Sequence, residues 1–93
     1  MEKVYLVVEH YLFEGQLNEI KTTHYKTKES AIKHFQNQVK REKEDSWIAT
    51  KRNVIEELTE KPDKNYYYYE AYIDGYACEF STTIYIKESD VLA

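Results

Sequence analysis

Residues 66–76 read Tyr-Tyr-Tyr-Tyr-Glu-Ala-Tyr-Ile-Asp-Gly-Tyr, and this stretch decides the fold class of the 93-residue chain. Its first eight residues favour β structure, and Asp74-Gly75 is a strong signal for a tight hairpin turn. Residues 76–87 supply a partner strand. The pattern therefore predicts a β-hairpin over residues 66–87.

The same turn predicts a register. A two-residue turn places Ile73 opposite Tyr76 and, three pairs further out, Glu70 opposite Glu79. Like charges directly opposite each other are mildly unfavourable. Either a bulge shifts this register, or both carboxylates lie at a solvated or functional surface.

A second hairpin is expected over residues 3–26. Residues 3–13 alternate, so that Val4, Leu6, Val8, His10 and Leu12 share one face while Tyr5, Val7, Glu9, Tyr11 and Phe13 share the other. Both faces are largely apolar, which suits an inner strand. A polar loop at 14–18 contains one of the two glycines, and a second strand follows at about 19–26.

After this hairpin the hydrophobic period changes from two to about 3.6. Thr27 suits a helix N-cap, and Ala31, Ile32, Phe35 and Val39 follow at helical spacing. The pattern predicts a helix over 28–44 whose narrow apolar stripe covers one face of a sheet.

Residues 46–60 allow two interpretations. Trp47, Val54 and Leu58 fit one helix face, while Val54, Glu56 and Leu58 also alternate as in a strand. The helix-forming glutamates in this segment slightly favour the helix. Residues 62–65 form a turn in either case.

These elements predict a single α+β domain spanning residues 1–93, with a small antiparallel sheet of four to five strands built from the two hairpins. The lone Cys78 forms no internal disulfide, which suits a reducing compartment. The chain contains no apolar run near the ~20 residues that a membrane span needs, and no basic-then-apolar leader. We therefore expect a cytoplasmic protein without a membrane segment.

The formal net charge of −4 conceals a segregation. Residues 21–43 carry seven basic and two acidic side chains, whereas residues 44–93 carry five basic and eleven acidic ones. Opposed charges of this kind steer association with charged partners, although a lysine-rich helix face also serves solubility alone. The candidate contacts for a nucleic acid or another anion are Lys28, Lys33, Lys40 and Arg41.

The run Tyr66–Tyr69 is the main functional signal. Successive strand residues project to opposite faces, so one helix cannot cover all four rings. Tyrosine is common in binding surfaces because it combines a stiff apolar ring with a polar tip. The partner-binding residues predicted on this basis are Tyr67, Tyr69 and Tyr85, with a polar rim of Glu70, Asp74 and Glu79. Alternatively, the segment at 45–61 or a second copy in a homodimer covers these rings.

Three functions remain open. The first is a non-enzymatic interaction module that binds a protein partner or itself through the tyrosine-rich sheet. An acidic inhibitor that imitates nucleic acid is the second, and a nucleic-acid binder acting through the basic helix is the third. Direct nucleic-acid binding by the tyrosines is disfavoured because their strands carry glutamate and aspartate where phosphate contacts need cations.

Metal binding and catalysis have little support. His10 and His24 can share a face of the first hairpin, but the sequence offers no evident third ligand. The chain has no glycine-rich phosphate loop, nucleophile elbow or paired-cysteine motif. We therefore predict no catalytic residue, metal or cofactor.

The segment Tyr25-Lys26-Thr27-Lys28-Glu29-Ser30-Ala31, which follows a hairpin and leads into a helix, resembles that of small uncharacterised bacterial and phage proteins. The resemblance covers roughly the first 40 residues. It implies a prokaryotic or phage accessory protein, and small acidic phage proteins often inhibit host systems. Because such proteins have no assigned chemistry, the resemblance assigns no functional residue.

Overall fold

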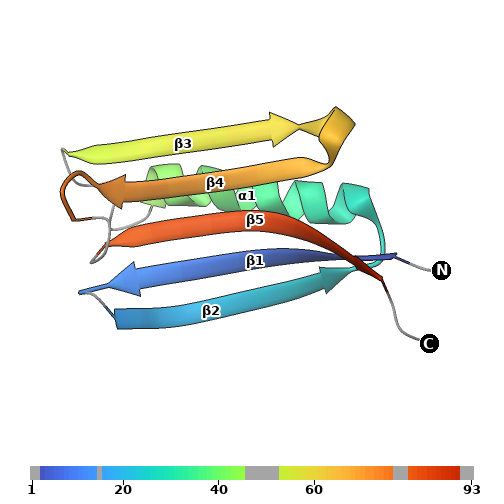
Figure 1. The fold of residues 1–93 in the computed structure, drawn as a ribbon, viewed down its shortest axis with the longest axis horizontal. Coiled ribbons are helices and arrows are strands. Elements are labelled where there is room, and N and C mark those ends of the chain that lie inside the picture. Colours follow the sequence, from blue (N-terminus) through green and yellow to red (C-terminus); the bar gives the residue numbers. More distant parts are fainter. Residues whose placement is uncertain (1–2, 15, 46–52, 77–79, 91–93) are drawn as a thin grey trace.

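A computed structural model describes residues 3–14, 16–45, 53–76 and 80–90. Five strands form one antiparallel sheet, and one helix packs against one face of it (Figure 1). The elements in chain order are β1 (Lys3–Phe13), β2 (Gln16–Tyr25), α1 (Lys28–Asp45), β3 (Val54–Lys61), the 3-10 turn η2 (Pro62–Lys64), β4 (Tyr66–Ile73) and β5 (Ser81–Asp90). Their order across the sheet is β2-β1-β5-β4-β3. The predicted α+β class is therefore confirmed.

The hairpin β1–β2 follows the predicted alternation. Its register sets Leu6 opposite His24 and His10 opposite Ile20, with a shift between Tyr11 and Leu12. On its other side β1 pairs with β5, so β1 is an inner strand, as its two apolar faces indicate.

Helix α1 begins where the capping residue predicts. The backbone N–H of Ser30 donates to Thr27 Oγ1 at 3.3 Å, and the N–H of Ala31 donates to the Thr27 carbonyl at 3.3 Å. Ala31, Phe35 and Val39 are buried at four-residue spacing and form the stripe that faces the sheet. The predicted helix over 28–44 is confirmed, with one further residue.

The helical interpretation of residues 46–60 is wrong for its second half. Residues 54–61 form β3, an edge strand paired along its length with β4 from Val54 opposite Ile73 to Lys61 opposite Tyr66. Pairing with a buried neighbour outweighs the helix propensity of exposed glutamates, which is worth only tenths of a kcal/mol per residue. Residues 46–52, including Trp47, lie outside the described residues.

The strand register predicted from the two-residue turn is also wrong, although the turn itself forms. Strands β4 and β5 meet with Tyr72 opposite Ser81 and Glu70 opposite Thr83, so the connection runs from Asp74 to Phe80. Within it the N–H of Tyr76 donates to the Ile73 carbonyl at 2.8 Å, which closes a turn without starting a hairpin ladder. The predicted Glu70–Glu79 pair is therefore not formed, and Glu79 itself lies outside the described residues.

The register of β5 has a physical reason. β5 lies between β1 and β4, and its pairing with β1 sets Val7 opposite Ile86 and Glu9 opposite Ile84. These pairs place Ile84, which is fully buried, under the helix. The core consists of Val7, Ala31, Phe35, Val39, Tyr67, Tyr69, Ala71 and Ile84.

Candidate functional site

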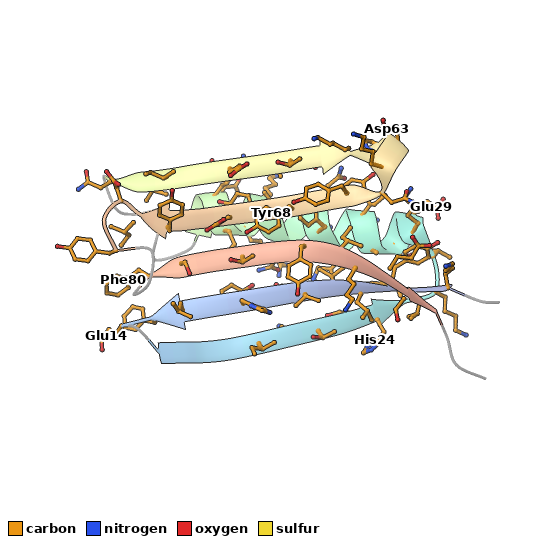
Figure 2. All side chains as sticks on the ribbon, viewed as in Figure 1. Glu14, His24, Glu29, Asp63, Tyr68 and Phe80 are labelled. Atoms are coloured by element: carbon orange, nitrogen blue, oxygen red, sulfur yellow. The ribbon has the colours of Figure 1, made fainter. Side chains whose placement is uncertain are left out.

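The sheet has a second face, opposite α1, that no described element covers. Figure 2 views the molecule from this side, with Tyr68 on the near face of the sheet and the helix behind it. Residues paired across an antiparallel sheet share a face, so the register assigns the members of this open face. They are Leu6, Val8, His10 and Leu12 on β1; Ile20, Thr22 and His24 on β2; Thr83, Tyr85 and Lys87 on β5; Tyr66, Tyr68, Glu70 and Tyr72 on β4; and Ile55, Glu57, Thr59 and Lys61 on β3.

The predicted exposure of Tyr67 and Tyr69 is wrong. Both rings point toward α1 and are only 5% and 1% exposed, and the Tyr67 ring meets the Phe35 ring edge-on at 5.9 Å. Tyr85 and Glu70 do lie on the open face, while Asp74 is exposed in the loop after β4. Glu79 lies outside the described residues.

The open face instead presents the other half of the tyrosine run. Tyr66 is 48% exposed, and its ring stacks against that of Tyr68 with centroids 6.3 Å apart. Tyr68 lies opposite Tyr85, whose ring meets the His10 ring edge-on at 5.9 Å. The strand pairing of Tyr68 with Tyr85 makes these two ring pairs neighbours, and we call the four rings together the aromatic strip across β4, β5 and β1.

The position of Glu70 in the sequence already indicates which tyrosines lie on the open face. Glu70 alternates in step with Tyr66, Tyr68 and Tyr72, whereas Tyr67 and Tyr69 alternate in step with Ala71. A carboxylate marks the wetter face of a strand, so Glu70 indicates that its own set faces outward.

Tyr68 and Glu70 are hydrogen-bonded to each other on the open face. The Tyr68 hydroxyl donates to Glu70 Oε2 at 2.9 Å, and Glu57 lies opposite Glu70 on β3. Burial, the hydrogen bond to Glu70 and nearby negative charge raise the pKa of Tyr68 to about 12. This part of the surface therefore offers a phenol hydroxyl beside two glutamate side chains.

A polar network lies on the covered side, between α1 and β1. Glu9 is 1% exposed; its Oε1 accepts the Tyr11 hydroxyl at 2.6 Å, and its Oε2 is 3.6 Å from His34 Nε2. His34 Nδ1 is in turn 2.7 Å from the Tyr25 hydroxyl. Burial, and the hydrogen bond to the Glu9 carboxylate, raise the pKa of Tyr11. Among the described residues this network gives Glu9 Oε1 a hydrogen bond but leaves the buried Oε2 without one, and it ties the helix to the β1–β2 hairpin.

This network was not predicted, although the sequence of β1 contains a signal for it. Glu9 alternates in step with Tyr5, Val7 and Tyr11, and a carboxylate on such an apolar face requires partners from a covering element. Which helix residue supplies the partner depends on how α1 docks, so His34 could not be identified from spacing.

A groove of about 400 Å³ runs beside this network. Its lining residues are Tyr25, Ser30, Lys33, His34, Asn37, Gln38 and Arg41. Among the predicted anion contacts, the structure brings together only Lys33 and Arg41. Lys40 lies in a separate depression with Leu58 and Glu60, and Lys28 Nζ donates to the Asn65 side chain near η2.

The two histidines considered for a metal share a face but not a site. His10 lies opposite Ile20, whereas His24 lies opposite Leu6, four residues further along β1. Among the described residues, no group of three histidine, cysteine, aspartate or glutamate side chains could hold a metal ion.

Within the described part of the chain, no helix combines the length and the hydropathy needed to cross a membrane. Comparisons with protein-family models, with curated proteins and with solved structures find no match to this chain.

Proposed function

We propose that this chain is a non-enzymatic interaction module, a bacterial or phage accessory protein of the cytoplasm, that binds a protein through its open face. The observation that carries the proposal is the aromatic strip of Tyr66, Tyr68, Tyr85 and His10, which no described element covers. Tyrosine-rich, stiff and half-buried surfaces are typical of protein interfaces.

The size of the open face supports this function. Five strands spaced ~4.8 Å apart and about eight residues long give a face on the order of 600 Å². Specific protein interfaces bury about 800 Å² per partner, so this face has about the area of the smaller ones. Aliphatic side chains extend the strip to both edges, where Ile20 is 56% and Ile55 is 39% exposed.

An acidic inhibitor is the second candidate. Glu57 and Glu70 lie side by side on the open face, so one part of the aromatic surface is acidic. Such a surface suits a basic host protein. The nucleic-acid alternative has less support, because Lys28, Lys40 and the Lys33–Arg41 pair lie at three separate places around α1.

Site-specific photocrosslinking tests the proposal. A benzophenone amino acid is placed at Tyr68 or Tyr85, or at the exposed helix position Gln36 as the matched control, and the chain is irradiated in its native cells. We expect a protein adduct from both open-face positions and none from Gln36. Equal or absent crosslinking at the three positions would contradict a role of the open face in protein binding.

A further inference from the structure

We infer that the partner of the open face is a second copy of this chain, bound face to face about a two-fold axis. This inference rests on the proposed function and names its partner. The supporting observation is the distribution of charge on the open face. When a second copy is rotated by 180° and laid face to face on the first, the acidic side chains of each copy lie against the basic side chains of the other.

The charges flank one central row of the sheet. This row contains Thr59, Tyr68 and Tyr85, which pair in sequence across β3, β4 and β5. Two residues to one side lie Glu57 and Glu70, the acidic row. Two residues to the other side lie Lys61 on β3 and Lys87 on β5, the basic row.

Among the described residues, no cation pairs with the acidic row. Glu57 and Glu70 face each other across β3 and β4, an arrangement that is unfavourable unless a cation approaches. Neither carboxylate forms an ion pair with another described residue, and the same holds for Lys61 and Lys87. Within the described part of the chain, the open face therefore holds two carboxylates and two ammonium groups without an ion-pair partner, separated by the central row.

A two-fold axis that runs along the central row, across the strands, gives both the carboxylates and the ammonium groups a partner of opposite charge. Such an axis lays each strand antiparallel to its own copy, so Glu57 of one chain meets Lys61 of the second copy, and the reverse contact forms as well. Lys87 of the second copy lies across the interface from Glu70 and is offset sideways by one strand spacing, about 5 Å, which these long side chains can span. The rings of Tyr68 and Tyr85 meet their own copies at the centre, where interfaces have their dry anchors.

The resulting assembly is an aligned two-layer sandwich. Its two open faces form the inner layers, and each α1 covers an outer side. Face-to-face sheets pack about 10 Å apart, which leaves room for interdigitated tyrosine rings. Each copy buries roughly 600 Å², near the lower end of standard interfaces, so a reversible dimer is expected.

A charge-swap experiment tests the inference. The E57K/E70K variant carries an all-basic open face, and the K61E/K87E variant carries an all-acidic one. The unmodified chain should have twice the chain mass of 11.2 kDa in sedimentation equilibrium. Each variant alone should self-associate at least about tenfold more weakly, because like charges then oppose each other across the interface. An equimolar mixture of the two variants should recover the dimer.

Matched controls carry the same charge changes on the helix side. The variants E29K/E44K and K33E/K40E change exposed residues of α1. In sedimentation equilibrium both should have the same dimeric mass as the unmodified chain. Far-ultraviolet circular dichroism of every variant verifies folding. An unmodified chain that stays monomeric at high concentration overturns the inference, as does a dimer that the swaps leave intact or a mixture that fails to associate.

The outcome is separable from that of the proposed function. If the chain is monomeric but Tyr68 still crosslinks to a different protein, the second copy is wrong and the interaction module stands. If crosslinking from Tyr68 gives only the homodimeric adduct, both stand. If each charge-swap variant alone dimerises as strongly as the unmodified chain and Tyr68 gives no adduct, both the second copy and the interaction module are wrong.

Discussion

Replacement of Tyr69 by alanine should destabilise the fold far more than the same replacement of Tyr68, its neighbour in the chain. Tyr69 is 1% exposed between α1 and the sheet, whereas Tyr68 lies half-buried on the open face. A buried tyrosine removes about 150–250 Å² from water, and aromatic-to-alanine changes in cores cost about 3–5 kcal/mol. The Tyr69 hydroxyl also donates to Glu56 Oε2 at 2.7 Å, and loss of such a bond costs about 1 kcal/mol. We expect a total loss of about 4 kcal/mol.

For Tyr68 the expected loss is about 1 kcal/mol, the usual scale for a solvent-facing strand residue. Urea unfolding followed by circular dichroism measures both, at a protein concentration low enough to keep association negligible. With a slope of about 1.5 kcal/mol per molar urea, Tyr69→Ala should lower the midpoint by about 2.5 M and Tyr68→Ala by less than about 1 M. The control Tyr69→Phe keeps the ring and should lower it by under 1 M. Equal shifts at the two positions, or a larger one at Tyr68, would refute the assignment of faces.

Three further predictions concern single residues. In the folded chain the pKa of Tyr68 is raised from 10.0 to about 12, mainly by burial, so the unfolded chain releases this proton at a lower pH. The free energy of unfolding should therefore fall as the pH rises from 10 to 12. Urea midpoints measured across this range should fall less in Tyr68→Phe, which has no hydroxyl to titrate. Gly75 has a φ of +83° and space for a Cβ, so Gly75→Ala should cost about 1 kcal/mol through the backbone alone, and Gly75→Asn less, in the same assay. Tyr11→Phe leaves the buried Glu9 carboxylate without a donor and should cost about 2 kcal/mol, against about 1 kcal/mol for Tyr25→Phe; similar losses would contradict the burial of that charge.

The sequence correctly predicted the secondary-structure elements whose formation depends on residues close together in the chain. The alternation of residues 3–13 predicted β1, and Thr27 followed by Ala31, Phe35 and Val39 predicted α1. The first reflects the period of two in strands and the second a cap followed by a period near 3.6. Both signals are independent of the rest of the molecule.

The errors concern features that distant residues decide. Residues 54–61 contain helix-forming glutamates and become β3 only because β4 offers a ladder to pair with. Asp74-Gly75 does form a turn, but the position of β5 depends on its pairing with β1, at the opposite end of the chain. Turn chemistry gives no information about that pairing.

Residues distant in the chain also decide whether Tyr67 and Tyr69 or Tyr66 and Tyr68 face the helix. This choice determines which face of the sheet is the candidate binding surface. One helix of 18 residues covers one face of this sheet, so either parity of the run 66–69 leaves two rings outside. The sequence therefore predicts how many tyrosines remain uncovered, while the docking of Phe35 against Tyr67 selects which ones. That selection places the uncovered rings in step with Glu70, so the aromatic surface and the Glu57–Glu70 pair coincide. Under the proposed function, a partner of this face therefore has to contact both the rings and the carboxylates, and the inferred second copy does so with the Lys61 and Lys87 of its own face.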